Sequence, residues 1–385
     1  MKKIVILYGG RSGEHEVSLV SAASIVRHLD ASLFEPILVG ASKEGEWYLQ
    51  EGSVAEKALG FADGEAEPDH GAAGAPLAIA EGRKVLAAPG RGLVVETPHG
   101  LESLDCDLVF PVLHGSFGED GTVQGLLEIA DLPYVGAPVL GSSLGMDKEK
   151  AKRLWLGAGL PVVPFLSVRS AALRDLEALA REAGSRFGWP CFVKPCCGGS
   201  SVGASKVDSA EALGPALAAA FRWDEKVLVE PFVSAREIEC AVLGNEEPVA
   251  FPPGEVAPTH DFYDYEAKYL DPEGARLEVP ARISPEQADR VKSVAIAAFK
   301  ACELAGMARV DFFIDKLTGE ILLNEVNSIP GFTRISMYPR MCEAGGLSYS
   351  ALITRLVELA LERRASRARL LHNHARRPHN YLVMQ

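Results

Sequence analysis

Hydrophobic and polar positions follow their clearest pattern in the last third of the chain. Two apolar runs, residues 310–314 and 321–326, flank a short turn of sequence Lys-Leu-Thr-Gly-Glu. Runs arranged in this way predict a β-hairpin, which we centre on Thr318. Because side chains alternate along a strand, this centre places Asp311 opposite Glu325 on one face of the hairpin.

The polar face of the predicted hairpin carries groups that suit a metal ion. They are Arg309, Asp311, Glu325 and Asn327, and Phe313 and Leu323 are expected to continue this face inward. Cross-strand neighbours lie roughly 4.5–5.5 Å apart at Cβ, and carboxylates that close repel unless a cation lies between them. Carboxylate and amide oxygens suit Mg²⁺, which typically arrives with nucleotide phosphates. The alternatives are an ordinary solvated strand face, or a bulge in the turn that shifts the register by one residue.

Apolar periodicity elsewhere predicts a mixture of strands and helices. The expected strands are residues 3–8, 34–39, 47–49, 107–113, 190–194, 226–232 and 238–243, with Arg236 and Glu237 in the connection between the last two. The expected helices are residues 17–29, 122–130, 146–156, 171–186, 209–221, 284–304 and 349–364. Residues 60–80 are expected to form a surface loop, and the Gly/Ser-rich residues 136–145 a domain boundary.

The chain opens with a strand, a glycine turn and a helix, which is the start of a Rossmann-like unit. The glycine spacing is not G-x-G-x-x-G, so the dinucleotide fingerprint is absent. The expected apolar stripe of the helix consists of Val17, Val20, Ala23, Ile25 and Leu29. Glu14 lies near the helix start, where a carboxylate complements the helix dipole. Recognition of a substrate ammonium group by Glu14 is the alternative.

Two polar loops follow predicted strands further along the chain. His114 opens the first, where it could bind a substrate carboxylate or form a hydrogen bond within its own loop. Lys194 ends a strand that runs into a glycine- and serine-rich loop containing Ser200 and Ser201. Such a loop offers backbone N–H groups and hydroxyls to phosphate oxygens. It lacks the G-x-x-x-x-G-K-[ST] pattern and a strand follows it, so we expect a flap over phosphates, with an ordinary hairpin as the alternative.

Composition narrows the class of protein. A chain of 385 residues is long enough for two or three domains, and a net charge of −13 argues against nucleic acid or an anionic membrane as the main partner. The sequence has no apolar run of about 18 residues, the length that a membrane helix requires. The 7 cysteines show no paired metal-site spacing and suggest free thiols in a reducing cytoplasm.

Several motifs agree in order with those of the D-alanine–D-alanine ligases of the ATP-grasp superfamily, and the sequence resembles that family from about residue 3 to 362. The motifs are Gly-Gly-Arg-Ser-Gly-Glu-His-Glu-Val-Ser (9–18), His-Gly-Ser-Phe-Gly-Glu-Asp-Gly (114–121), Met-Asp-Lys (146–148), Phe-Val-Lys-Pro (192–195), Gly-Ser-Ser-Val-Gly (199–203), Tyr-Asp-Tyr-Glu-Ala-Lys-Tyr (263–269), Arg-Val-Asp (309–311) and Asn-Glu-Val-Asn-Ser-Ile-Pro-Gly-Phe-Thr (324–333). The resemblance implies an α/β and α+β architecture, with a Rossmann-like N-terminal domain followed by a two-part ATP-grasp fold. It also implies that one D-alanine carboxylate attacks the γ-phosphate of ATP, and that a second D-alanine amine attacks the resulting acyl phosphate.

The resemblance assigns roles to residues that match the family motifs. The catalytic set is Glu14, Ser200, Tyr269, Arg309 and Gly331, of which Arg309 and the Gly331 N–H would stabilise the oxyanion and Glu14 would hold the first D-alanine ammonium. The substrate-binding set is His114, Lys268, Ser336 and Met337. The ATP-binding set is Lys148, Lys194, Ser201, Glu230, Glu237, Lys268 and Asn324. Asp311, Glu325 and Asn327 would hold two Mg²⁺ or Mn²⁺ ions.

The resemblance also implies the organisation of the chain. The expected parts are residues 1–136 as the N-terminal domain, 137–230 and 231–364 as the central and C-terminal ATP-grasp parts, and 365–385 as a disordered basic tail after a frayed helix end. The expected partners are D-alanine and ATP, without nucleic acid or membrane, and a homodimer stays open. A ligase that makes D-alanine–D-lactate or D-alanine–D-serine is the alternative, and a Rossmann-type oxidoreductase is the alternative from another class. Two departures from the family are Pro231, where some relatives have lysine, and Cys196-Cys197 before the glycine loop.

Overall fold

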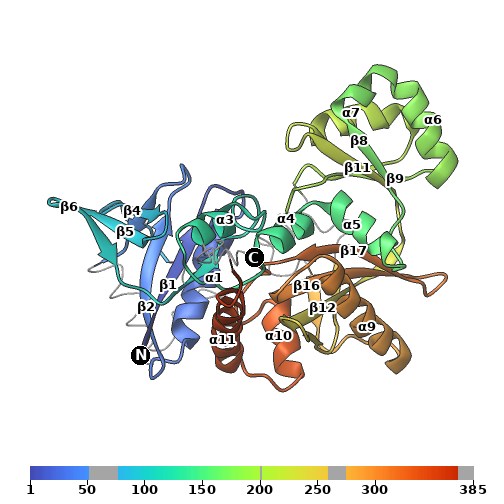
Figure 1. The fold of residues 1–385 in the computed structure, drawn as a ribbon. Helices are drawn as coiled ribbons and strands as arrows, with labels where there is room; N and C mark the ends of the chain where they lie inside the picture. The colour runs from blue at the N-terminus through green and yellow to red at the C-terminus, as the bar shows by residue number, and fades with distance from the viewer. Residues whose placement is uncertain (52–76, 200–201, 259–274, 372–385) are drawn as a thin grey trace, which may run out of the picture.

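The computed structural model of the chain describes residues 1–51, 77–199, 202–258 and 275–371. Figure 1 shows the N-terminal elements on the left, a lobe with α6 and α7 at the upper right, and a sheet with α9 and α10 below it. The strands are β1 (Lys2–Gly9), β2 (Phe34–Ala41), β3 (Trp47–Leu49), β4 (Val85–Ala88), β5 (Gly92–Thr97), β6 (Gly100–Leu104), β7 (Leu108–Val112), β8 (Leu166–Arg169), β9 (Cys191–Pro195), β10 (Ser205–Val207), β11 (Lys226–Pro231), β12 (Ala235–Gly244), β13 (Val249–Ala250), β14 (Gly254–Pro258), β15 (Ala275–Glu278), β16 (Gly306–Asp315) and β17 (Ile321–Asn327). The helices are α1 (His15–His28), α3 (Thr122–Ile129), α4 (Val139–Met146), α5 (Lys148–Gly157), α6 (Leu176–Phe187), α7 (Ala210–Ala220), α9 (Pro285–Ala301), α10 (Met337–Ala344) and α11 (Tyr349–Arg367), with a 3₁₀ turn at Ser170–Asp175.

The N-terminal sheet has the order β3-β2-β1-β7, and β1 runs parallel to both of its neighbours. Its strands lie within a few residues of the predicted ones. A second sheet, the meander β4-β5-β6, was not predicted. Gly90, Gly92 and Gly100 mark its turns with positive φ angles, so a turn signal was present in the sequence.

Helix α1 buries three serines in addition to the predicted Ala23 and Ile25. Val17 and Val20 are half-buried, whereas Ser18, Ser21 and Ser24 are buried. Each of the three hydroxyls has a hydrogen-bond partner in a neighbouring segment. A buried hydroxyl costs little once it is paired, so paired serines lie on the buried side of the helix together with its apolar residues.

The upper lobe is an antiparallel sheet of order β10-β9-β11-β8, covered by α6 and α7. Strand β9 carries Lys194 toward the glycine loop, and β10 follows that loop, as predicted. The core of the lobe is formed by apolar side chains such as Val193, Leu217 and Val229. The residue after β9, Cys196, is held by hydrogen bonds to Lys226 of β11 and to Lys148 of α5.

The C-terminal sheet has the order β15-β14-β12-β16-β17, with β13 paired to β12. Helix α9 begins as predicted, with a capping box between Ser284 and Gln287 and with Pro285 in the first turn. It buries Val291 and Ala298 against the sheet. Helix α5 joins the same core through Trp155, whose indole N–H donates to the Ala298 carbonyl at 3.1 Å.

The predicted hairpin is confirmed, although its turn is centred half a residue earlier than expected. Phe313 pairs with Leu322 near the turn, and a register shift after Asp311 then restores the predicted pairing of Asp311 with Glu325. The shift places Asn324 as the extra residue of a β-bulge. It also reverses the prediction for Leu323, which is fully buried in the core instead of continuing the polar face.

Two connections differ in detail from the sequence analysis. The Gly/Ser-rich segment predicted as a domain boundary contains most of helix α4, which was not predicted. A Cβ on Gly141 would lie 2.4 Å from the Glu303 carbonyl oxygen, so the small residues allow the helix to pack closely on its neighbour. Arg236 and Glu237 lie within β12, because the strand begins before the apolar run that was used to place it.

Helix α11 is not frayed at its end. It continues to Arg367, and it runs beside the N-terminal elements in Figure 1. Arg363 donates to the carbonyl oxygens of Tyr134 and Gly136, and Arg367 pairs with Glu128. Both arginines therefore have hydrogen-bond or ion-pair partners that are distant in the sequence. Among the described helices, none combines the length and the apolar character needed to cross a bilayer.

Candidate active site

Arg309 holds the polar face of the hairpin together. Its guanidinium donates to the two carboxylate oxygens of Asp311, at 2.8 and 2.7 Å, and lies 3.2 Å from the Glu239 carboxylate on β12. Asn327 donates its amide to Asp311 at 2.9 Å. Burial acts to lower the pKa of Arg309, but the Asp311 and Glu239 carboxylates outweigh it and raise that pKa.

Lys148, the first residue of α5, approaches Glu325 on the other strand of the hairpin. Its Nζ lies 3.3 Å from the Glu325 carboxylate and donates to the Gly198 carbonyl at 2.6 Å. Its backbone N–H donates to the Cys196 carbonyl at 3.1 Å. Burial acts to lower the pKa of Lys148, but Glu325 outweighs it and raises that pKa. This one lysine thus joins the hairpin, α5 and the base of the glycine loop.

A cavity lies where these groups meet the N-terminal elements. Its lining residues are Glu14, Glu119, Met146, Lys148, Gly198, Gly199, Glu325, Val326, Asn327 and Ser328. The Glu14 carboxylate lies close to two backbone segments, since a Cβ on either Gly115 or Gly199 would be 2.5 Å from its Oε2. The structure therefore brings Glu14, Lys148 and Glu325 to one cavity, although they are far apart in the sequence.

Glu119, which the sequence analysis did not single out, connects two sides of this cavity. Its Oε2 accepts from the Gly115 N–H at 2.9 Å, and its Oε1 accepts from the Ile329 N–H at 2.7 Å. Burial raises the pKa of Glu119 to about 7, and the nearby Glu14 carboxylate acts in the same direction. Glu119 ties the loop after β7 to the segment that follows the hairpin.

Lys194 belongs to a buried polar chain behind the glycine loop. Its Nζ donates to the Asn324 side-chain oxygen at 2.9 Å and lies 2.8 Å from Glu230. The other Glu230 oxygen lies 3.0 Å from Lys152, whose side chain is fully buried. Burial acts to raise the pKa of Glu230, but the two lysines outweigh it and lower that pKa. Burial lowers the pKa of Lys152 to about 8. The bulge at Asn324 turns this amide toward Lys194.

His114 makes contacts that differ from one expectation. It is buried, with Nδ1 2.8 Å from the Ile329 carbonyl and Nε2 3.0 Å from the Ser21 hydroxyl. Burial lowers its pKa. The two ring nitrogens thus contact residues outside the loop of His114, which differs from the expected hydrogen bond within that loop. The assignment of His114 to substrate binding stays a prediction.

The predicted residues after the hairpin lie close to one another. Ser336 precedes α10, which starts at Met337, and its hydroxyl lies 2.7 Å from that of Thr333. A Cβ on Gly331 would lie 3.2 Å from the Ser336 hydroxyl, a tight contact that a small shift of that side chain would have to relieve. Gly331 and Ser336 therefore share one turn of the chain.

The remaining predicted residues divide between described and undescribed parts of the chain. Ser200, Ser201, Lys268 and Tyr269 lie outside the described residues. Glu237 lies on β12, opposite Phe313 of β16. Within the described ranges, no three His, Cys, Asp or Glu side chains converge in a way that would hold a metal ion. The predicted ligand set contains two carboxylates and an amide.

Comparisons with known proteins agree with this geometry. Residues 3–137 match the family described as "D-ala D-ala ligase N-terminus", and residues 154–358 match "D-ala D-ala ligase C-terminus". A D-alanine–D-alanine ligase from Treponema denticola is 48% identical over 363 residues, which cover 94% of this chain and 96% of the relative. The chain belongs to the D-alanine–D-alanine ligase family.

Solved structures of relatives share the arrangement. The D-alanine–D-alanine ligase from Coxiella burnetii has a TM-score of 0.78 at 35% identity, covering 96% of this chain and 97% of the other. A D-Ala:D-Ser ligase from Enterococcus faecalis has a TM-score of 0.79 at 36% identity, covering 93% of this chain and 99% of the other. The fold is thus the mixed α/β fold, with several sheets, of these ligases.

Some residues around this cavity were not predicted from the sequence. Lys152 follows Lys148 by one helical turn, so the sequence shows a basic face of the helix, but it does not show that the Lys152 side chain is buried. Glu239 lies on the same face of β12 as Glu237, in a segment that was assigned only for its apolar residues. Lys226 and Glu119 contact partners in other elements. Alternation and spacing within one element do not reveal such contacts.

Proposed function

We propose that this chain joins two D-alanine molecules to D-alanyl-D-alanine with hydrolysis of ATP to ADP and phosphate, for peptidoglycan precursor synthesis. The observation that carries the proposal is the cavity shared by Glu14, Lys148 and Glu325. It combines a carboxylate for an amino-acid ammonium with cations for phosphate and with hard oxygen ligands. Phosphoryl transfer depends mainly on positioning and on neutralising charge, and these groups supply both.

The first part of the reaction is assigned to residues around the cavity. Glu14 holds the ammonium of the first D-alanine, and its position against Gly115 and Gly199 fixes the carboxylate for that contact. Lys148 and Lys194 bind the phosphates of ATP. The first D-alanine carboxylate then attacks the γ-phosphate, which yields an acyl phosphate and ADP.

The second part of the reaction uses the turn after the hairpin. Arg309 and the Gly331 N–H stabilise the oxyanion that forms when the second D-alanine amine attacks the acyl phosphate. Ser336 and the Met337 backbone receive the second carboxylate. His114 is assigned to the substrate-binding set, and its contact with the Ile329 carbonyl joins it to the segment after the hairpin.

The nucleotide base and its metal ions have candidate residues as well. Glu230 and Glu237 are proposed to contact the adenosine, with Asn324 beside Lys194. The oxygens of Asp311, Glu325 and Asn327 fit Mg²⁺ or Mn²⁺ because they are hard ligands and gather on one hairpin face. Bound there, the ions would neutralise charge on the phosphates.

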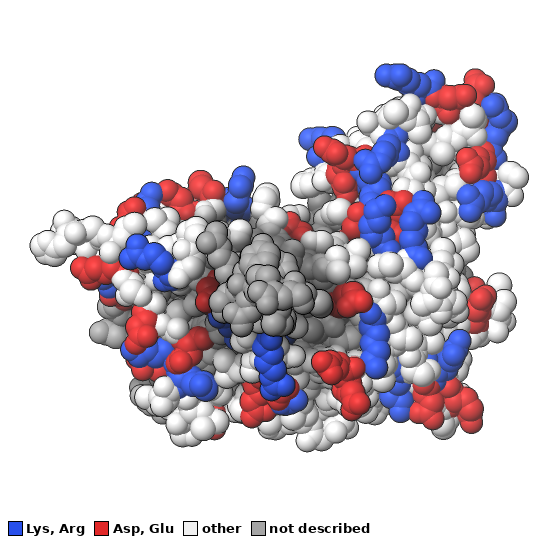
Figure 2. Space-filling view, viewed as in Figure 1, with Lys and Arg blue, Asp and Glu red and all other residues white. Residues whose placement is uncertain are grey.

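Positive groups of the proposed site are buried rather than spread over the surface. The side chains of Lys148, Lys152, Lys194 and Lys226 are 12%, 0%, 10% and 7% exposed. Figure 2 shows acidic and basic side chains mixed over the visible face of the molecule. A chain with a net charge of −13 thus places part of its positive charge inside, and Lys148 brings such a charge to the cavity.

The domain division is part of the proposal. Residues 1–136 are proposed as a Rossmann-like substrate domain, which the parallel strands around β1 support. Residues 137–230 and 231–364 are proposed as the two ATP-grasp parts, with the glycine loop on the first and the hairpin on the second. Helix α5 belongs to the first part by sequence but packs on the sheet of the second, so it connects the two.

A ligase that uses D-lactate or D-serine is not favoured. The curated relatives that are 44–48% identical to this chain over 94% or more of its length are D-alanine–D-alanine ligases. The oxidoreductase alternative finds no support in the family matches.

Nucleotide turnover measured with separate D-amino acids and with D-lactate tests the proposal. We expect ADP and phosphate to be released only when D-alanine is present, with D-alanyl-D-alanine identified by mass. Release of AMP, turnover that does not depend on D-alanine, or a mixed product with D-lactate or D-serine as the main one would contradict it.

A further inference from the structure

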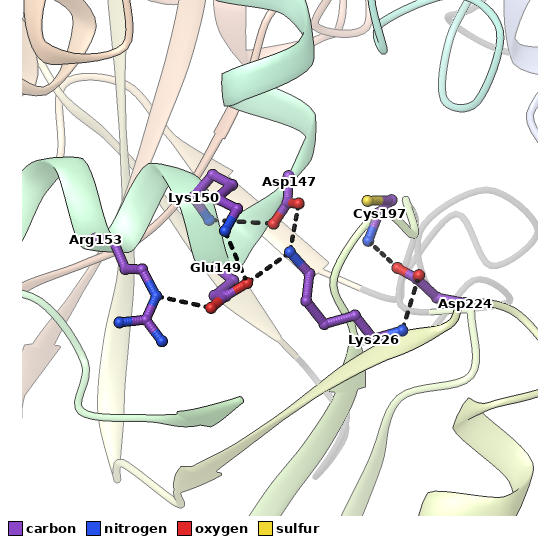
Figure 3. Close-up of polar contacts among 7 residues, drawn as sticks. All are labelled: Asp147, Glu149, Lys150, Arg153, Cys197, Asp224 and Lys226. Carbon is purple, nitrogen blue, oxygen red and sulfur yellow. Dashed lines mark hydrogen bonds and ion pairs between the residues drawn. The ribbon is translucent and has the colours of Figure 1, made fainter. Parts of the chain in front are cut away.

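A closed set of charged groups lies beside the proposed site, where α5 meets the upper lobe. Lys226, the first residue of β11, has its ammonium 2.5 Å from the Asp147 carboxylate and 2.7 Å from the Glu149 carboxylate. Figure 3 shows the lysine reaching from its strand to the start of α5, between these two acids. We call Lys226, Asp147 and Glu149 the Lys226 cluster.

The Lys226 cluster holds Lys148 from both sides. Asp147 and Glu149 are the residues immediately before and after Lys148, and the same ammonium binds both. Asp147 also caps α5 by accepting from the Lys150 N–H. A fixed backbone on both sides limits the positions that the Lys148 ammonium can reach, and that ammonium lies between Glu325 and Gly198.

The glycine loop is anchored to the same strand. The Lys226 carbonyl accepts from the Cys196 N–H at 3.0 Å, and the Cys196 carbonyl accepts from the Lys148 N–H at 3.1 Å. Asp224 accepts from the Cys197 N–H at 2.6 Å and from the Lys226 N–H at 3.1 Å. Strand β11, the start of α5 and the base of the glycine loop are therefore one connected unit.

We infer that Lys226 is a positioning residue for the nucleotide, which holds Lys148 and the base of the glycine loop in the arrangement that receives the phosphates. This inference rests on the proposed function, because it assigns Lys148 to the phosphates. Lys226 does not line the cavity itself. It is connected to the cavity through Lys148 and the residues next to it. A lysine that only stabilised the fold would leave the affinity for nucleotide unchanged once the protein is folded.

The surrounding charges support a role that depends on geometry and not on titration. Burial acts to lower the pKa of Lys226, but its bonds to Asp147 and Glu149 outweigh it and raise that pKa. The ammonium therefore stays charged at every pH at which the enzyme would be studied. Effects of substituting Lys226 then report position and charge pairing.

The test compares Lys226→Met and Lys226→Arg with Arg153→Gln as the matched control. Arg153 binds Glu149 at 2.7 Å as Lys226 does, but its side chain is 59% exposed. We expect Lys226→Met to raise the KM for ATP about tenfold, while the KM for D-alanine changes less than about twofold. Lys226→Arg should recover part of the loss, and Arg153→Gln should match the wild type.

Calorimetry with a non-hydrolysable ATP analogue and Mg²⁺ gives a direct reading of the coupling. If Lys226 acts through Lys148, Lys226→Met should weaken analogue binding about tenfold in the wild-type background and have no further effect after Lys148→Ala. Additive losses in that double variant would overturn the inference. So would a folded Lys226→Met enzyme with wild-type affinity for ATP and for the analogue.

A milder variant keeps the inference testable if Lys226→Met does not fold. Asp147→Asn retains a side chain that caps α5 but removes one ion pair of the cluster. It should raise the KM for ATP about threefold, and an unchanged KM would contradict the inference. If the wild-type enzyme shows no D-alanine-dependent turnover, the proposed function fails, which is a different result.

Discussion

The hairpin face and the Lys226 cluster use similar charges in opposite ways. On the hairpin, the Asp311 and Glu325 side chains are 13% and 25% exposed, and Glu325 lines the cavity. In the cluster, Glu149 and Lys226 are each 7% exposed, Asp147 is 20% exposed, and the lysine binds both acids directly. The hairpin face contributes to the cavity lining, whereas the cluster does not. We therefore expect the charged groups of the hairpin to bind the ligand and those of the cluster to hold Lys148 in position.

The two regions also differ in whether the sequence could predict them. Strand alternation with a turn centred on Thr318 places Asp311 opposite Glu325, because both residues lie within one hairpin. The contacts of Lys226 span 79 and 77 residues. No periodicity links residues so far apart, so only the folded chain reveals the cluster.

The sharpest way to break the comparison is to remove the hairpin carboxylates. Asp311→Asn or Glu325→Gln should reduce D-alanine-dependent ADP release by about 10³-fold, as expected when a charged group is lost from a preorganised site. Binding of the Mg²⁺ complex of an ATP analogue, measured by calorimetry, should weaken in parallel.

Stability should change little in these hairpin variants, because Arg309 keeps Glu239 and Lys148 keeps the Gly198 carbonyl. The midpoint of thermal unfolding should shift by no more than about 4 °C, roughly the effect of 1–2 kcal/mol in a chain of this size. Full turnover in either variant would show that the hairpin acids do not take part in the reaction.

The hairpin also shows how much of the register can be predicted from the sequence. The facing of Asp311 and Glu325 was predicted correctly, but the turn lies half a residue earlier and a bulge at Asn324 compensates. A bulge depends on the packing of both strands, which alternation does not encode. It also explains why Leu323 is buried and why Asn324 reaches Lys194.

Other differences have similarly specific causes. Helix α4 was not predicted because glycine and serine are poor helix formers, yet a Cβ on Gly141 would lie 2.4 Å from the Glu303 carbonyl oxygen. The buried serines of α1 were missed because hydrogen bonding, not apolarity, places them inside. By contrast, α9 was predicted well, since Ser284 and Pro285 signal its start locally.

A second prediction concerns the closed cluster and acts on stability as a function of pH. Burial acts to raise the pKa of Glu149, but hydrogen bonds from Lys226 and Arg153 outweigh it and lower it from 4.5 to about 2. A lowered carboxyl pKa contributes stability that is present above pH 4.5 and lost as the pH falls toward 2. Glu149→Gln should therefore reduce the free energy of unfolding at pH 7 by on the order of 3 kcal/mol.

Urea unfolding of the wild type and of Glu149→Gln at several pH values measures this effect. The difference between the two should shrink as the pH is lowered from 4.5 toward 3. A difference that stays constant over this range would mean that the charge of Glu149 contributes no stability. The cluster would then not stabilise the protein through its ion pairs, and it would not differ from the hairpin face in this respect.

The smallest expected effect lies at the rim of the same cluster. Lys150 lies 3.6 Å from the Glu149 carboxylate and is 52% exposed, and Arg153 is 59% exposed. Solvated charges lose little when a pair is broken, so Lys150→Gln and Arg153→Gln should each change the free energy of unfolding by less than about 0.5 kcal/mol. Glu149 keeps Lys226 in both variants, so its low pKa should persist and the acid-dependent loss of stability should remain. A rim variant that destabilised the protein as much as Glu149→Gln would contradict this prediction. Burial would then not distinguish strong from weak ion pairs in this cluster, and Lys226 would not stabilise Glu149 more than Lys150 or Arg153 does.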